Sequence, residues 1–421
     1  MPGLSTFTDF MAATGPAYLS SPDSVINEVQ KQNYLLGEFF RGKDMEQIVQ
    51  GGSKIRDVSL LGERNTFQHI KPNQPFSVSQ PQQLKTLEAN WRFSQDQKTW
   101  NEQQILLNDG DPKVVYKRYK RVLDQGMWTS MLNGLDSSLL ASPYSMYTEM
   151  ESADGTNPYT LHAFITEHIL STARGYMGGV PTGWTNVMGV NPSTTDRWSN
   201  QLTFYTPAAS SPNSADVANG ALTGHNAISA GGVRIFALLT GFDDMWSKLQ
   251  WKSPGVKDEH FDQTIAGQQM ILCSRLGINA YRQALRASND QLLGGMSRSD
   301  ASYQNPVYGG VALREVSEWN TAAVWPAAAS AVTNTLAGRN GQTVTQGGSE
   351  TQDITVDKGP RFMFLNRMYM SAVIHSEKFL TQDAPRQADL QHTWYQTCQC
   401  WWNLFCHSRQ RQGLLAPVLA A

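Results

Sequence analysis

Apolar side chains recur with a helical spacing in several stretches of the chain, and two of them bear on function. The first stretch, residues 22–41, begins after Ser21 and with Pro22, a pair that commonly starts a helix. Its apolar residues fall on roughly one face: Val25, Ile26, Val29, Leu36 and Phe40. We therefore expect an amphipathic helix over residues 22–41.

The second stretch, residues 111–135, gives the clearest helical pattern in the sequence. It opens with Asp111 and Pro112, and an apolar stripe follows: Val115, Tyr119, Val122, Met127 and Met131. The other side carries four basic residues: Lys113, Lys117, Lys120 and Arg121. Such a row is either a solvated helix face or a strip that faces phosphate groups or a protein partner, and the spacing supports both equally.

Between these two helices the apolar residues become sparse. Residues 62–106 predict a long, polar, two-stranded arm, whose outgoing side contains prolines that restrict backbone pairing. On the returning side Trp91 and Phe93 share one strand face, and Arg92 lies between them. Because an isolated two-stranded ribbon is marginal in water, the arm must rest either on its own body or on a neighbouring subunit.

Near the end of the chain the apolar residues alternate with period two, which predicts a strand. One face of it carries Trp394, Cys398, Cys400, Trp402, Leu404 and Cys406. Zinc would require sulfur ligands about 2.3 Å from one ion, whereas same-face neighbours on a strand lie about 6.6 Å apart. A nucleophilic cysteine would need a base, which only His407 could supply by folding back. We therefore expect a core strand with buried, reduced cysteines.

Composition narrows the class of protein further. The chain has 421 residues, 40% hydrophobic and 17% charged, which is typical of a soluble globular protein with two or three subdomains. A formal net charge of -2 argues against whole-molecule attraction to nucleic acid or to an anionic membrane, so any basic contact must be local. No apolar run approaches the roughly 20 residues of a membrane span, and the first residues lack a secretion signal, so we expect a cytoplasm-like compartment.

Sequence motifs of common enzymes are absent. The closest approach to one is residues 37–44, which have the glycine and lysine spacing of a phosphate-binding loop, but Asp44 replaces the magnesium-binding hydroxyl and a helix precedes the glycine. His162 and His168 are six residues apart on a helix predicted over residues 157–173, and so they point in different directions. We therefore predict no catalytic residue, no metal, no cofactor and no enzymatic activity.

The order of the predicted elements resembles that of the major capsid proteins of tailed bacteriophages, which have the Hong Kong 97-type fold. The matching segments are the arm at 62–106, the helix at 111–135, the strand-like "VYGGVALREVSEW" and the closing "DLQHTWYQTCQCWWNLFCHSRQRQGLLAP". The resemblance implies an α+β, Hong Kong 97-like fold with five segments: an N-terminal arm (1–61), an extended hairpin loop (62–107), a peripheral domain with a long spine helix (108–230), an axial domain (231–360) and closing strands of both domains (361–421).

The resemblance also implies a function. It is that of a structural protein that assembles with itself into the pentamers and hexamers of an icosahedral head around double-stranded DNA. The implied partners are a separate scaffolding protein, a portal, a decoration protein and packaged DNA, held by non-specific contact, with assembly in the host cytoplasm and no membrane. Another virion subunit, of the portal or tail, is the alternative; a hydrolase with a dispersed site is a weaker one.

Within that family the hairpin loop lies across the adjacent subunit, so the resemblance assigns interface roles to residues on the returning side of the arm. These residues are Trp91, Arg92, Phe93 and Trp100. A basic strip would face DNA or a neighbouring subunit, and its members are Lys113, Lys117, Lys120, Arg121, Arg409 and Arg411. Some relatives form a Lys-to-Asn cross-link, but no partner asparagine is identifiable for the arm lysines, and we do not predict one.

Overall fold

The computed structural model describes a little more than half of the chain, in segments separated by gaps. The described residues are 34–40, 46–48, 52–61, 84–101, 112–141, 143, 146–166, 168–172, 175–181, 183–205, 227–228, 234–236, 238–249, 269–290, 306–320, 333–334, 344–345, 360–388 and 392–417. These segments form helices and several sheets, as the predicted α+β class requires. Among them, no helix combines the length and the apolar character needed to cross a membrane.

The first large sheet has six strands arranged around β19 (Thr393–Cys406). β19 pairs antiparallel with β4 (Arg92–Asn101) over ten positions, from Thr393 opposite Asn101 to Trp402 opposite Arg92. On its other edge β19 pairs in turn with β16 (Met370–His375), β17 (Thr381–Gln382) and β18 (Arg386–Gln387). β1 (Glu46–Ile48) extends the sheet beyond β16.

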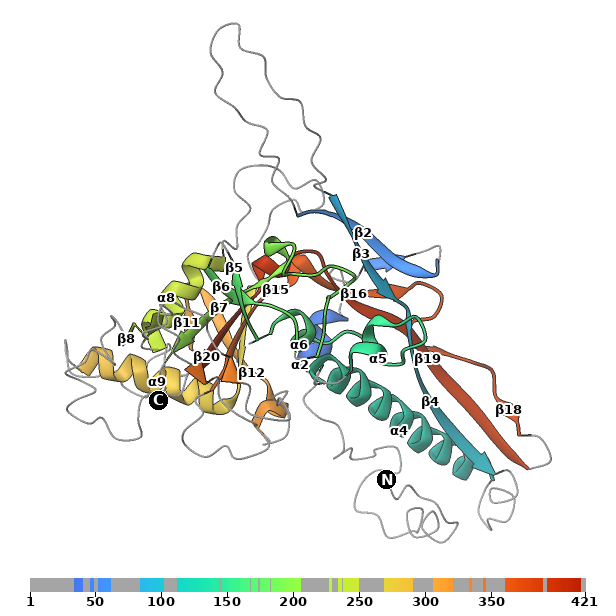
Figure 1. Cartoon of the computed structure of the whole chain (residues 1–421). Helices are drawn as coiled ribbons and strands as arrows, with labels where there is room; N and C mark the ends of the chain where they lie inside the picture. The colour runs from blue at the N-terminus through green and yellow to red at the C-terminus, as the bar shows by residue number, and fades with distance from the viewer. Residues whose placement is uncertain are drawn as a thin grey trace, which may run out of the picture.

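A long helix covers one side of this sheet. α4 (Pro112–Leu140) contacts β4 and runs alongside it (Figure 1), so the helix predicted at 111–135 is confirmed and continues to residue 140. α2 (Tyr34–Phe39) packs on α4, where the backbone N–H of Leu36 donates to Asp136 at 2.8 Å. Residues 22–33 of the predicted first helix lie outside the described residues.

The second large sheet has ten strands and lies at the other end of the molecule (Figure 1). Its main order is β11 (Val307–Tyr308), β12 (Val311–Glu315), β10 (Gln269–Cys273), β15 (Phe362–Asn366), β20 (Gly413–Pro417), β7 (Asn200–Tyr205), β6 (Gly175–Gly178) and β5 (Ile169–Thr172). β9 (Arg234–Phe236) joins at β7 and carries β8 (Ala227–Ile228). The sheet therefore takes strands from both sides of residue 230, where the predicted peripheral and axial segments meet.

Two helices pack on the second sheet. α8 (Leu238–Leu249) lies on β7 and β20, and α9 (Arg275–Asp290) contacts β10 and β12. Two short helices, α5 (Tyr147–Glu151) and α6 (Leu161–Phe164), follow α4. The remaining elements are short: 3-10 turns at Asp196–Trp198, Ser317–Asn320, Arg367–Tyr369 and Arg409–Arg411, and a pair of strands, β13 (Thr333–Asn334) and β14 (Val344–Thr345).

One pair of strands forms a separate two-stranded ribbon. β2 (Lys54–Leu60) pairs antiparallel with β3 (Leu84–Asn90), from Lys54 opposite Asn90 to Leu60 opposite Leu84. The predicted arm is thus wrong in its limits, since the outgoing strand starts at residue 54 and the returning strand ends at residue 90. Residues 92–101, which we had placed in the arm, belong to the six-stranded sheet because their backbone pairs with β19. Residues 62–83 and 102–106 lie outside the described residues.

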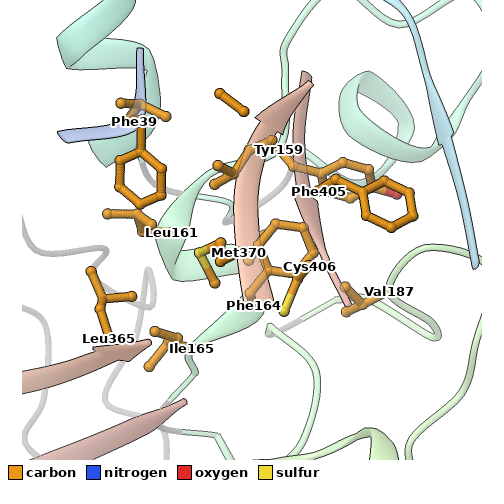
Figure 2. Packing of buried hydrophobic residues seen from close by; sticks show 14 of the residues in the cluster. Phe39, Tyr159, Leu161, Phe164, Ile165, Val187, Leu365, Met370, Phe405 and Cys406 are labelled. Carbon is orange, nitrogen blue, oxygen red and sulfur yellow. The ribbon is translucent and has the colours of Figure 1, made fainter. Parts of the chain in front are cut away.

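The larger hydrophobic core lies between the six-stranded sheet, α4 and the segment around α6. Figure 2 shows its centre, where Phe164, Met370 and Cys406 point toward one another. A smaller core lies under α8 and α9, with Phe242 at its centre in contact with the rings of Tyr281, Phe362 and Phe364.

Candidate assembly surfaces

The cysteines of β19 lie in the core. Cys398, Cys400 and Cys406 are fully buried free thiols on the face of β19 that also carries Trp402 and Leu404. Burial raises the pKa of Cys400 and of Cys406 to about 12, so both remain protonated at neutral pH. His407 does not fold back on them, because its Nδ1 lies 2.7 Å from Asp57 Oδ2 of the ribbon. Among the described residues, no three His, Cys, Asp or Glu side chains gather as metal ligands.

The opposite face of β4 and β19 is exposed. Its central residues carry no charge of their own, but Asp383 beside them accepts hydrogen bonds from Thr397 at 3.0 Å and from Gln399 at 2.9 Å. Four cross-strand pairs lie on it: Phe93 with Trp401, Gln95 with Gln399, Gln97 with Thr397, and Thr99 with Tyr395. The β4 member of each pair is exposed and the β19 member is half-buried. We call these eight residues the outer face. Uncharged polar and aromatic side chains of this kind are easier to desolvate than charged ones, so the outer face is suited to contact with another protein.

Aromatic rings mark one end of the outer face. The Phe93 side chain is 62% exposed and meets the ring of Trp401 edge to face, with 4.8 Å between centroids. Trp401 in turn contacts His375, which contacts Trp91. An exposed phenylalanine held by a half-buried tryptophan is a preformed apolar anchor, because little side-chain entropy remains to be lost on binding.

Two of the predicted interface residues are inside the subunit. Arg92 is completely buried, and its guanidinium donates to backbone carbonyls of the same chain, including Met150 O and Ser152 O at 2.7 Å each. Trp91 is 8% exposed, and its Nε1 donates to Gly52 O at 3.0 Å. The interface role predicted for Arg92 is therefore wrong, because its guanidinium already donates to carbonyls of its own subunit. Trp100, opposite Trp394 on β19, is half-buried.

Lys98, one of the arm lysines, also lies inside the subunit. It is 5% exposed and forms an ion pair with Asp124 of α4. Because Lys98 alternates with the exposed residues of β4, its side chain projects toward the helix and not toward the outer face. The pair fixes α4 against β4, and sequence reasoning missed it because nothing local to either residue indicates that the two elements meet.

The ribbon has a packed base and an exposed outer part. At the base, Ile55, Leu87 and Ala89 are buried against the body, while farther out Val58 is 58% and Leu84 is 63% exposed. Val58 lies opposite Thr86. Thr86 and Leu84 are two residues apart on β3, so Val58 and Leu84 share one side of the ribbon. Exposed apolar side chains on a projecting two-stranded ribbon favour burial against another surface.

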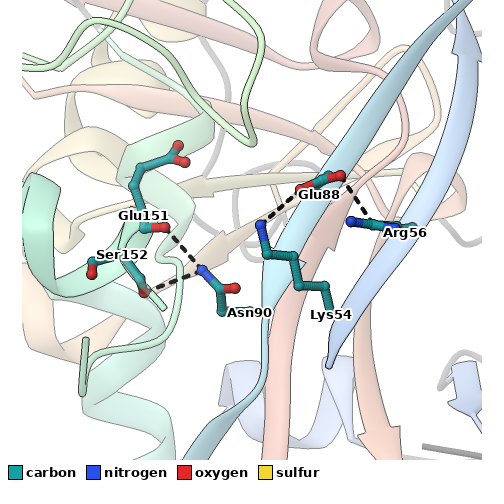
Figure 3. A network of polar contacts seen from close by, with 6 residues as sticks. All are labelled: Lys54, Arg56, Glu88, Asn90, Glu151 and Ser152. Atoms are coloured by element: carbon teal, nitrogen blue, oxygen red, sulfur yellow. Dashed lines mark hydrogen bonds and ion pairs between the residues drawn. The ribbon is translucent and has the colours of Figure 1, made fainter. Parts of the chain in front are cut away.

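Ion pairs hold the two strands of the ribbon together near its base (Figure 3). Glu88 of β3 accepts from Lys54 at 2.9 Å and from Arg56 at 3.0 Å, and both basic residues lie on β2. The hydrogen bond from Lys54 is the main reason that the pKa of Glu88 is lowered. These contacts are solvent-exposed, so they orient the strands more than they stabilise them.

The predicted basic strip does not form one surface. Lys113, Lys117, Lys120 and Arg121 lie on α4 by their backbone, and their side chains are outside the described residues. Arg411 is half-buried, with its guanidinium 5.6 Å from the centroid of the Tyr369 ring. Arg409 was predicted to face DNA or a partner, and this prediction is wrong. Its side chain is fully buried. Its guanidinium donates to several internal carbonyls.

The carbonyls around Arg409 come from three separate segments. Its guanidinium donates to Phe164 O at 2.8 Å, Trp198 O at 3.0 Å and Gly179 O at 2.6 Å. Burial lowers the pKa of Arg409 to about 10, which leaves it charged at neutral pH. The Arg-rich turn thus joins the segments that precede β5, follow β6 and precede β7. The sequence signal was misleading, because an arginine in a turn is usually solvated.

Comparison with solved structures finds similar chains in viral shells, whereas no family model and no curated protein matches this sequence. The capsid of a native GTA particle is 9% identical with a TM-score of 0.46, over 98% of this chain and 99% of that one. The capsid of cyanophage A-1(L) is 10% identical with a TM-score of 0.47, over 96% and 97%. The capsid of cyanophage P-SCSP1u is 11% identical with a TM-score of 0.46, over 96% and 94%. Along nearly its whole length, this chain is similar to capsid structures of phages and phage-like particles.

Proposed function

We propose that the chain is a structural major capsid protein, which assembles with copies of itself into the pentamers and hexamers of an icosahedral phage head around double-stranded DNA. The observation that carries this proposal is the ribbon, whose outer part exposes Val58 and Leu84. Within the described residues, β2 and β3 pair only with each other. A projecting ribbon with apolar side chains on its outer part is an element that gains a second surface when subunits associate.

The outer face of β4 and β19 is the surface we assign to a neighbour's ribbon. It offers Phe93 and Trp401 as apolar anchors and uncharged side chains around them. The ribbon and the outer face are different patches, so their contact is heterologous, and contacts of that kind close into rings when the rotation between subunits allows it. Rings of five and six are the units that the proposal requires.

Further partners follow from the same proposal. We include as partners a separate scaffolding protein that sets the size of the head, a portal through which DNA enters, and a decoration protein on the outside. The basic residues of α4 and Arg411 would face DNA or an adjacent subunit. The head forms in the host cytoplasm and becomes part of the virion.

A matched pair of substitutions on the ribbon tests the proposal. Leu84→Glu places a charge on the exposed apolar side, while Lys85→Glu changes the charge of the next residue, whose side chain projects to the opposite side of the strand. We expect Leu84→Glu to abolish ring- and shell-sized species in sedimentation velocity and Lys85→Glu to retain them, with both proteins folded by circular dichroism. Equal assembly of the two variants would contradict the assignment of Leu84 to an interface.

A further inference from the structure

The ribbon leaves the body at a junction of three residues. β3 ends at Asn90, β4 begins at Arg92, and only Trp91 stands between them. β3 pairs with β2 in the ribbon, whereas β4 pairs with β19 in the six-stranded sheet. The direction in which the ribbon projects therefore depends on the backbone of these three residues, together with the contacts of the ribbon's base, where Asp57 lies 2.7 Å from His407 of the body.

Each side chain of the junction is held by the body. Asn90 Nδ2 donates to Glu151 O at 2.9 Å and to Ser152 O at 3.1 Å, at the end of α5 (Figure 3). Trp91 donates to Gly52 O at 3.0 Å, just before β2 begins. The side-chain amide of Asn403 on β19 donates to the Asn90 carbonyl at 2.6 Å. The junction is thus fixed to α5, to the start of the ribbon and to the sheet at the same time.

Arg92 contributes the largest number of these contacts. Its guanidinium and Nε donate to the carbonyls of Met150, Ser152, Ala153, Gly155 and Asn157. Those carbonyls belong to the last part of α5 and the turn that follows it. A buried arginine whose guanidinium makes this many hydrogen bonds has little rotational freedom. Arg92 therefore fixes the first residue of β4 relative to α5.

A second connection runs from α5 to β3 through the turn at residues 187–190. Glu151 accepts from the backbone N–H of Met188 at 2.7 Å, and the Met188 carbonyl accepts from the N–H of Glu88 at 3.3 Å. Met188 has φ 53°, a left-handed conformation that a non-glycine residue adopts where its surroundings hold it. Burial raises the pKa of Glu151, although the hydrogen bond from Met188 acts in the opposite direction.

We propose that this clamp, formed by Asn90, Arg92, Glu151 and the turn at 187–190, sets the direction of the ribbon within the isolated subunit. The ribbon then projects at a fixed angle before any neighbour touches it. A flexible ribbon would lose conformational entropy when it docks on a neighbour, and this loss opposes binding. A ribbon of fixed direction has already lost that entropy during folding. The proposal goes beyond the proposed function, because the clamp acts within one chain whether or not shells form.

Distance measurements between two spin labels test the clamp. One label is placed on the ribbon at Thr86→Cys and the other on α4 at Ser130→Cys, and both positions are exposed. The four native cysteines are buried and should remain unlabelled. Labelled chains are diluted with unlabelled chains and studied by double electron–electron resonance in the smallest species that sediments. We expect one narrow distance distribution for the otherwise unchanged chain.

Asn90→Ala is the variant that loosens the clamp, because it removes two hydrogen bonds without removing a buried charge. We expect its distance distribution to broaden, and amide exchange in β2 and β3 to become about tenfold faster or more, as loss of two ordinary hydrogen bonds predicts. Lys54→Ala is the control, since it removes an ion pair within the ribbon and leaves the junction intact, so its distribution should stay narrow. A broad distribution in the unchanged chain, or a narrow one in Asn90→Ala with unchanged exchange, would overturn the proposal.

Discussion

At the scale of single residues, buried charged side chains are the feature that distinguishes this subunit. Arg92 and Arg409 are both completely buried. Arg92 satisfies backbone carbonyls of one segment, residues 150–157, whereas Arg409 satisfies carbonyls from three separate segments. Removing one partner from such an arrangement is costly, because the carbonyls stay buried without a donor. Both residues therefore stabilise the fold through internal hydrogen bonds, and neither is available as a contact for DNA.

Substitution of Arg409 tests its internal role. We expect Arg409→Met to reduce the free energy of unfolding by at least about 3 kcal/mol, because three buried carbonyls lose their donor at about 1 kcal/mol or more each. Arg411→Met, next but one along the chain and half-buried, should cost within about 1 kcal/mol. Urea unfolding measures the loss in free energy of unfolding for each variant. Similar losses for the two variants would contradict the internal role of Arg409.

His162 gives the subunit a pH dependence. Burial, aided by the positive charge of Arg361, lowers the pKa of His162 to about 3. An unfolded histidine takes up a proton near its ordinary pKa of about 6.5 and the folded one does not, so the stability present above that pKa is lost as pH falls toward 3. We expect the free energy of unfolding to fall by up to about 1.4 kcal/mol per pH unit in that window from this residue.

Urea unfolding between pH 7 and pH 4 separates this contribution from others. The His162→Gln variant should show a shallower loss of stability on acidification, whereas His392→Gln, at an exposed position, should follow the unchanged chain. Parallel curves for all three proteins would mean that His162 is protonated as readily in the folded subunit as in the unfolded chain.

At the scale of elements, what could be predicted from the sequence was local periodicity. The long helix α4 was visible because its apolar stripe has a helical spacing, and β19 was visible because its cysteines and tryptophans alternate. The strand pairing was not visible. Residues 92–101 look like the return of a hairpin, yet they pair with residues about 300 positions later, because a strand's partner depends on the whole fold.

The segment around His162 shows the same limitation for helices. Residues 157–173 carry a helical pattern, but the structure has only a four-residue helix, α6, followed by the strand β5. Pairing of β5 with β6 outweighs the helical preference of a short sequence, since tertiary context commonly overrides propensity. The clamp at the ribbon junction was equally hidden, because its donors and acceptors are about 60 residues apart.

Truncation of the ribbon tests its role as a separate element. Replacement of residues 58–86 by a short Asn-Gly turn keeps Ile55, Leu87 and Ala89, which pack on the body, and keeps β4 paired with β19. We expect the shortened subunit to fold with an unchanged near-ultraviolet circular dichroism spectrum and to fail to close shells. Normal shells from this variant would show that the outer ribbon is dispensable for closure.

A deletion that extends through residue 102 is the informative contrast. It removes β4, and with it ten paired positions on β19 and the ion pair between Lys98 and Asp124. We expect that variant to be insoluble, because β19 would expose an unpaired edge and α4 would lose the strand that it contacts. The two deletions together separate the folding role of β4 from the assembly role of the ribbon.

At the scale of the whole molecule, a nearly neutral subunit suits dense packing into a shell. With a net charge of -2, copies of the chain repel one another weakly, and contact with DNA must come from local basic residues.

Charge reversal on α4, by Lys113→Glu together with Lys117→Glu, tests whether these residues face DNA. We expect shells of normal size that retain less DNA after nuclease treatment; unchanged retention would remove α4 from the DNA-facing surface.

Electron microscopy of the purified protein, with sedimentation alongside and with or without a candidate scaffolding partner, tests the capsid proposal most directly. The proposed function predicts rings of five and six subunits and closed shells. In them the ribbon, with its exposed Val58 and Leu84, and the outer face with Phe93 would be buried. In a reconstruction of those particles, the ribbon of one subunit should lie on the outer face of its neighbour. A protein that stays monomeric under every condition would contradict the proposal.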